Sequence, residues 1–207
     1  MKKNYSYIGI SFIILIFGIW AVPKIVETLS KPELATIGPV PSFEFTDQNG
    51  KTITNKDYEG KVYVVEFFFT TCPSICPIMN ENMIKIQNEF LGNPKVGIAS
   101  FTIDPEHDTP EVLKTYAENT GITKLQWHLL TGDKDDIFKL ANEGFNLYVG
   151  KGSEAEGGFE HSGYFALIDQ DGNIRSRIDE FDNPIIYYDG LEDKQIQMLK
   201  EDIKALL

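Results

Sequence analysis

The chain has 207 residues, of which 42% are hydrophobic and 24% are charged, proportions that are ordinary for a globular protein. The formal net charge of −12 is not ordinary, and leaving Lys2 and Lys3 (+2) out of the count gives −14 for the rest. A domain this acidic repels nucleic acid and anionic lipid, which excludes nucleic acid as a partner and favours a protein with a basic face. The length predicts an N-terminal segment followed by one domain.

An apolar run, Ile8–Val22, follows the lysines and is interrupted only by Ser11 and two glycines. Its length is near the lower limit of about 17 residues for a membrane span. No small-x-small cleavage site and no lipid-accepting cysteine follow it, so we expect residues 1–23 to be an uncleaved membrane anchor, with a cleaved signal peptide as the alternative. The lysines then lie in the cytoplasm and the domain on the extracytoplasmic, periplasmic side, where thiols are prone to oxidation.

After a linker expected at residues 24–40, periodicity and turn residues predict strands that alternate with helices over residues 41–207. The predicted elements are, in chain order, a strand at 41–46, a turn at 47–51, a strand at 62–69, a helix at 78–90, a strand at 96–103, a helix at 110–119, a strand at 127–130, a helix at 133–142, a hairpin of 163–168 and 173–178, and a helix at 191–206. This alternation predicts an α/β domain with a partly parallel sheet.

Residues 150–160 form a glycine-rich, acidic stretch directly before His161. Such a stretch is typical of a solvated loop between two strands. The alternative is a mobile flap that brings His161 to the cysteines, and one loop can serve as both.

Both cysteines, Cys72 and Cys76, lie between the predicted strand and the predicted helix, where backbone N–H groups and the helix dipole favour negative sulfur. Three residues separate them, whereas redox dithiols usually have two. On a regular helix their Cβ atoms would lie about 5–6 Å apart, wider than the roughly 3.8 Å of a disulfide. That spacing suits two thiolates that each bind one ion at about 2.3 Å. Pro73 and Pro77 disfavour helical angles at the preceding cysteines, so a disulfide stays open.

Two thiolates alone make a poor divalent site, so a third ligand is expected. His107 lies in a polar loop and is expected to face solvent, and His128 follows a tryptophan in an apolar strand and is expected to pack in the core. His161 lies where a ligand can be positioned and released. Two cysteines and a histidine with a weak fourth position suit copper, since thiolates hold Cu(I) and imidazole helps to accommodate Cu(II).

Four ordered blocks of the chain resemble the Sco/SenC family, and the resemblance extends from Pro41 to the C-terminus. The blocks are Phe67–Pro77 with the cysteines, Ser100–Pro110, Trp127–Gly132 with its Trp and Leu-Thr-Gly, and His161–Ser162 followed by Leu167–Asp169 and Gly172. The order and spacing of all four make the resemblance specific, whereas the cysteine motif alone is only moderately so.

The resemblance implies a thioredoxin-like fold, with a central mixed sheet flanked by helices, behind an N-terminal transmembrane helix. It also implies a copper chaperone for cytochrome c oxidase assembly that delivers Cu(I) or Cu(II) to the CuA site of oxidase subunit II or to another copper acceptor. The resemblance further implies that the copper ligands are Cys72, Cys76 and His161, and that Asp104 takes part in copper handling or partner contact.

Two other functions compete with copper delivery. A thiol-disulfide oxidoreductase would use Cys72 and Cys76 as a dithiol that reduces the cysteines of the oxidase copper site. Such a reductase has no need of His161, whereas a copper site does. A peroxidase needs a thiolate beside an arginine, and the only arginines, Arg175 and Arg177, lie on a late predicted strand. Whether the protein is an enzyme is therefore left open at the sequence level.

Overall fold

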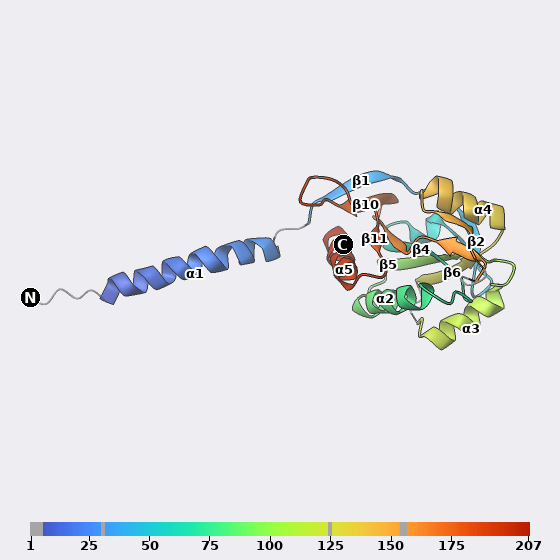
Figure 1. Cartoon of the computed structure of the whole chain (residues 1–207), viewed down its shortest axis with the longest axis horizontal. Coiled ribbons are helices and arrows are strands. Elements are labelled where there is room, and N and C mark those ends of the chain that lie inside the picture. Colours follow the sequence, from blue (N-terminus) through green and yellow to red (C-terminus); the bar gives the residue numbers. More distant parts are fainter. Residues whose placement is uncertain (1–5, 30–31, 124–125, 154–156) are drawn as a thin grey trace, which may run out of the picture. The chain divides into compact units, whose positions relative to one another are not determined.

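The computed structural model describes residues 6–29, 32–123, 126–153 and 157–207 (Figure 1). The chain divides into two compact units, Met1–Glu33 and Leu34–Leu207. The first contains helix α1, Ser6–Leu29, on which Phe12, Leu15 and Trp20 are exposed. Within the described ranges, no helix has both the length and the hydropathy required to cross a membrane.

The second unit is built on a mixed sheet with the strand order β1-β10-β9-β4-β5-β6-β2-β3, in which β11 also pairs with β9. A separate two-stranded sheet joins β7 and β8. The strands are β1 Leu34–Pro39, β2 Glu44–Asp47, β3 Thr52–Thr54, β4 Val62–Phe68, β5 Val96–Thr102, β6 Trp127–Thr131, β7 Val149–Lys151, β8 Phe159–His161, β9 Tyr164–Ile168, β10 Asn173–Arg177 and β11 Tyr188–Asp189. The mixed α/β architecture predicted from the sequence is thus confirmed.

Strands β4 and β5 form the centre of this sheet, and every residue of both is buried. They pair in parallel from Val62↔Val96 to Phe68↔Thr102. Strand β9 flanks β4 on the other side and runs antiparallel to it. Burial on both faces is the reason that these two strands are continuously rich in β-branched and aromatic residues.

Helices cover the two faces of the sheet, with α2 and α3 on one side of the central strands and α4 on the other (Figure 1). Thr109 and Asp133 cap two of them, since their side chains accept the N–H groups of Val112 and of Asp135 and Asp136. The predicted helix 133–142 is divided into α4 and one turn of π-helix. The bounds are α2 Cys76–Glu89, α3 Pro110–Thr120, α4 Lys134–Lys139, the π-turn Leu140–Gly144, α5 Asp193–Leu206 and a 3₁₀ turn at Asn55–Tyr58.

The linker expected at residues 24–40 differs from the structure at both of its ends. Helix α1 continues to Leu29, and residues 34–39 form the edge strand β1, which pairs antiparallel with β10. The Arg175 guanidinium donates to the carbonyl oxygens of Leu34 (2.8 Å) and Ala35 (3.3 Å). Gly38 and Pro39 made this segment look like a linker, but an edge strand tolerates both because only one side of it is hydrogen-bonded.

The turn predicted at residues 47–51 connects β2 to β3 and is organised by the buried carboxylate of Asp47. One oxygen accepts the backbone N–H groups of Asn49 (2.8 Å) and Lys51 (2.9 Å), and the other lies 3.0 Å from Nδ1 of His128. Burial alone would raise the pKa of Asp47, but these hydrogen bonds outweigh it and the pKa is lowered.

We expect Asp47→Ala to lower the free energy of unfolding by about 1–3 kcal/mol at pH 7, because it removes a buried acceptor that serves three partly buried hydrogen bonds. Because the pKa is lowered in the folded state, this contribution is complete above the unfolded value of about 3.9 and is lost as pH falls through the folded value. Urea unfolding of wild type and variant at pH 7 and at pH 3 measures the destabilisation and its decrease in acid. Asp193→Ala is the control, since Asp193 is exposed and its pair with Lys85 is worth at most about 1 kcal/mol. A difference between wild type and Asp47→Ala that does not shrink in acid would contradict the assignment.

Candidate metal centre

The two cysteines lie on either side of the boundary between a loop and helix α2. Cys72 follows β4 and has no regular secondary structure, whereas Cys76 is the first residue of α2. The helix begins there although Pro77 follows, because a proline in the first turn removes no helical hydrogen bond. Both thiols are free and buried, and the N–H of Cys76 donates to Sγ of Cys72 at 3.4 Å. The arrangement with both cysteines on a helix does not occur.

His161 lies at the end of β8 and completes a group of three side chains. Its Nε2 is 3.2 Å from Sγ of Cys76, 85 residues earlier in the chain, and the ligand atoms of Cys72, Cys76 and His161 all lie within 4.8 Å of one another. Its Nδ1 donates to the carbonyl oxygen of Ser162 at 3.1 Å. Since a carbonyl only accepts, this bond leaves Nε2 directed at the cysteines as the nitrogen that binds a metal.

A β-hairpin, rather than an irregular loop, carries His161 to the cysteines. Strands β7 and β8 pair with Val149 opposite His161. The Phe159 ring packs on Phe69 at 5.5 Å, and the His161 ring lies 5.9 Å from the same phenylalanine. At Gly157, which has φ +81°, a Cβ would lie 2.9 Å from the Phe69 ring, so the hairpin returns closely over the end of β4. Residues 154–156 lie outside the described ranges, so the mobility of the flap stays a prediction.

The electrostatics differ between the two thiols. The hydrogen bond from the Cys76 thiol lowers the pKa of Cys72 to about 3, against the effect of burial, with help from His161 and from the backbone N–H groups of Cys76 and Ser74. The interaction with Cys72, together with burial, holds the pKa of Cys76 well above its ordinary value. The metal-free site therefore contains one thiolate, at Cys72, and one thiol, at Cys76.

Glu66 is a buried acid of β4 to which sequence analysis assigned no role. Ser100 Oγ donates to its carboxylate at 2.6 Å, and Trp127 Nε1 donates to the same Ser100 oxygen at 2.9 Å. Burial raises the pKa of Glu66 to about 7, while the Ser100 hydrogen bond and the charge of His161 lower it. The signal in the sequence was a single charge within an otherwise apolar strand.

Asp108 fixes the loop that contains the cysteines. Its fully buried carboxylate accepts the Thr70 N–H (3.0 Å) and hydroxyl, the Thr102 hydroxyl (2.5 Å) and Nδ1 of His107 (2.9 Å), so it joins the ends of β4 and β5. Asp104, predicted to handle copper, is half-buried nearby and does not belong to the three-residue group. Burial, then the charge of Asp108, raises the pKa of Asp104.

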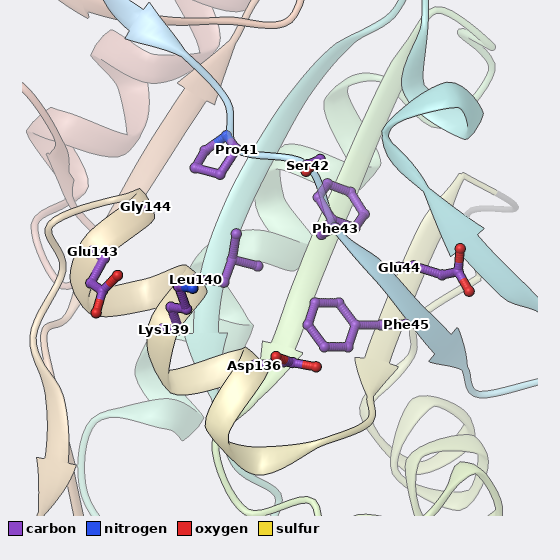
Figure 2. Close-up of a pocket in the computed structure, with 10 residues that line it drawn as sticks. All are labelled: Pro41, Ser42, Phe43, Glu44, Phe45, Asp136, Lys139, Leu140, Glu143 and Gly144. Atoms are coloured by element: carbon purple, nitrogen blue, oxygen red, sulfur yellow. The ribbon is translucent and has the colours of Figure 1, made fainter.

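The other two histidines lie away from the cysteines. The His107 side chain is half exposed, as expected for a loop residue, and bonds to Asp108. His128 is largely buried against Asp47 and the Tyr58 ring, as expected for a packed residue. A hollow of about 730 Å³ between β2 and α4 also lies apart from the site, since its lining includes Phe43, Phe45 and Leu140 but neither cysteine (Figure 2).

The fold and this ligand geometry agree with a known family. The family model described as SCO1/SenC matches residues 33–194. This chain belongs to the SCO1/SenC family. The SCO1 protein homolog of Bacillus subtilis (strain 168) is 32% identical to it over 168 residues, which cover 80% of this chain and 81% of that protein.

Two solved structures extend the likeness. BsSco, in which a disulfide switch was identified, is a member of the Sco family of cytochrome c oxidase assembly proteins; it matches with a TM-score of 0.70 and 29% identity over 86% of this chain and 98% of its own. Bradyrhizobium japonicum ScoI with copper bound matches with a TM-score of 0.63 and 26% identity, over 82% of this chain and 99% of its own. The thioredoxin-like fold of Sco structures is therefore that of this domain, and copper is bound by a relative.

The donor set of this chain fits copper. Two sulfur atoms and an imidazole nitrogen are the soft and intermediate ligands that copper takes in proteins. A structural zinc site usually has four protein ligands, and no fourth His, Cys, Asp or Glu joins this group within the part of the chain that the structure describes.

We expect Cys72 to react as a thiolate well below neutral pH in the reduced, metal-free protein. An ordinary thiol reacts with iodoacetamide about tenfold more slowly for each pH unit below its pKa of about 8.5, because only the thiolate attacks. A pKa of about 3 predicts a nearly constant rate for Cys72 between pH 5 and pH 8. Mass spectrometry of the alkylated protein measures it.

The Cys76→Ser variant keeps a hydrogen-bond donor beside Cys72, and Cys72 is then the only thiol that reacts. The Cys72→Ser variant leaves Cys76 as the only thiol and is the control, which we expect to react slowly. A rate for Cys72 that rises tenfold per pH unit up to pH 8 would contradict the assignment of the thiolate.

Proposed function

We propose that this protein is a copper chaperone that binds one copper ion through Cys72, Cys76 and His161 and delivers it to the CuA site of cytochrome c oxidase subunit II. The observation that carries the proposal is the convergence of these three ligand atoms within 4.8 Å of one another. The copper-bound relative and the relative described as an oxidase assembly protein support it.

The residues are arranged to accept copper as cargo with little rearrangement. Cys72 already carries negative charge, so it attracts the cation first. Cys76 keeps its proton in the metal-free site, with Nε2 of His161 3.2 Å from its Sγ, and copper binding displaces this proton. The bond from His161 Nδ1 to Ser162 keeps Nε2 directed inward throughout. Three protein ligands leave a position open, through which a ligand of the acceptor can enter before the ligands of this chain leave.

The acidic domain supports delivery to a partner with a basic face, because opposite charges raise the rate of encounter. Asp104 is proposed to contact that partner, since it is accessible in the loop after β5.

The second candidate function is reduction of the oxidised cysteine pair of the same copper site, and the Cys72 thiolate favours it. Cys72 would attack one sulfur of the partner's disulfide to form a mixed disulfide, and the partner's other sulfur would leave as a thiolate. Cys76, after losing its proton, would attack Cys72 and release the second thiolate. This chain then holds the Cys72–Cys76 disulfide, and the partner has gained two electrons and is reduced.

We further propose that residues 1–23 anchor the protein in the membrane, with the domain on the periplasmic side. The exposed apolar side chains of α1 and the preceding lysines support this topology. Release of the full-length protein from membranes by alkaline carbonate would contradict it.

The copper proposal predicts that each chain binds one copper ion. It also predicts that a His161→Ala variant loses more affinity for Cu(II) than for Cu(I). We expect Cu(II) affinity to fall at least tenfold more than Cu(I) affinity, because two thiolates suffice for Cu(I) whereas Cu(II) needs the imidazole. Competition with chelators of known affinity measures both constants. His107→Ala is the matched control, since His107 lies outside the group of three ligands. If wild type and His161→Ala bind Cu(I) and Cu(II) with equal affinities, the assignment of His161 as a copper ligand is wrong.

A paired assay separates the two functions. The copper-loaded protein is mixed with the reduced, copper-free CuA domain, and the reduced, copper-free protein is mixed with the oxidised CuA domain. Copper transfer in the first mixture supports the chaperone. Dithiol formation in the second, without transfer in the first, supports the reductase instead.

A further inference from the structure

A small apolar surface lies directly beside the metal ligands. It consists of Ile75, Ile78 and Leu191, and we refer to it as the rim patch. Ile78 is 49% exposed and Leu191 is 38% exposed, and Ile75 is partly buried next to Cys76. The side chains of Leu191 and Ile75 converge over Gly163, two residues after His161, where a Cβ would lie 3.5 Å and 3.7 Å from them. The patch therefore joins the cysteine side of the site to the histidine side.

Hydrogen bonds hold the loop that carries Leu191 against both sides of the site. The buried Asn82 of α2 donates from Nδ2 to the carbonyl oxygen of Gly190 at 2.7 Å. The N–H of Gly190 donates to the carbonyl oxygen of Gly163, also at 2.7 Å. A Cβ at Gly190 would lie 2.9 Å from that oxygen and from the Phe165 ring, so only glycine allows this approach. Leu191 is thus presented on a fixed support, and its exposure is a property of the fold.

The charges around the rim patch are mostly negative. Lys85 and Asp193 neutralise each other across 2.9 Å. Neither Glu81 of α2 nor Glu192 of the Leu191 loop forms an ion pair within the described ranges, and both are exposed. Between Glu81 and Lys85 of α2 and from Asp189 to Lys194, the acidic side chains outnumber the basic ones, four to two. The acidic residues are Glu81, Asp189, Glu192 and Asp193, and the basic ones are Lys85 and Lys194.

We propose that the rim patch is the docking surface for the protein that exchanges copper with this site, and that the matching face of this partner has an apolar centre bordered by lysine or arginine. This inference rests on the proposed copper function. An exposed leucine and isoleucine on a rigid support are suited to contact a partner, because their burial removes apolar surface from water and the rigid support lowers the entropic cost. The acidic border provides attraction and orientation for a basic partner. Docking here places the acceptor's ligands next to Cys76 and His161, where exchange occurs.

The test compares an Ile78→Ser, Leu191→Ser double variant with Leu91→Ser. Leu91 is 50% exposed in the loop after α2, at the end of that helix far from Cys76, and is the matched control. Each full-length copper-loaded protein is mixed with increasing concentrations of copper-free CuA domain. We expect the double variant to need about tenfold more acceptor for half-maximal transfer, and Leu91→Ser to behave as wild type within twofold.

Two further measurements show that the change acts on docking. Transfer to the small chelator bathocuproine disulfonate needs no protein surface, and we expect equal rates for all variants. A Glu81→Gln, Glu192→Gln variant should lose at least half of the salt dependence of transfer to the CuA domain, because it removes the two exposed acidic side chains of the border that form no ion pair.

If the double variant needs an acceptor concentration for half-maximal transfer within twofold of that of wild type, the proposed role of the rim patch is overturned, while the copper function stays intact. Slower transfer to the chelator by the same factor would also overturn it, since the substitutions would then act on the metal site. A wild-type protein that binds no copper, or that transfers none to the CuA domain, would overturn the proposed function and this inference with it.

Discussion

The metal site depends on the position of β4 between a parallel and an antiparallel neighbour. Its carboxyl end leads directly to Cys72 and to the start of α2 at Cys76. Because β9 runs antiparallel to β4, the amino end of β9 lies beside that carboxyl end, and β9 begins three residues after His161. Hydrogen bonding between these strands therefore brings together ligands that are 85 residues apart. Burial of β4 on both faces makes this pairing a part of the core.

Buried polar groups around β4 position the site at a cost in desolvation that their hydrogen bonds offset. Asp108 fixes Thr70 and hence the start of the cysteine loop. Glu66 accepts a hydrogen bond from Ser100, whose oxygen in turn accepts one from Trp127. No fully buried side-chain nitrogen or oxygen among the described residues lacks a hydrogen-bond partner. A satisfied polar network of this kind favours one arrangement of the core, since alternatives leave charges or donors unpaired. The thiols and the imidazole are thereby held in place before any metal arrives.

The same geometry is compatible with carrying copper and with carrying electrons. A thiolate at Cys72 beside a protonated Cys76 is ready to bind a cation and is equally ready to attack a disulfide. His161 adds an imidazole that only the first role requires. The rim patch and its acidic border serve either role, because both need a second protein to approach the same few atoms.

The sequence by itself determined the elements whose signals are local. The buried runs of β4 and β5, the turn at Asp47, the cap at Thr109 and the cysteine spacing were all predictable, because each depends on neighbouring residues. The resemblance to a family directed attention to His161, which spacing alone left open.

Only the tertiary structure decided what depends on distant partners. Strand β1 forms because it pairs with β10. Asp108 anchors the cysteine loop because its carboxylate is enclosed by the ends of β4 and β5. Periodicity is a property of adjacent residues, whereas strand pairing and burial of a charge are set by contacts across the fold.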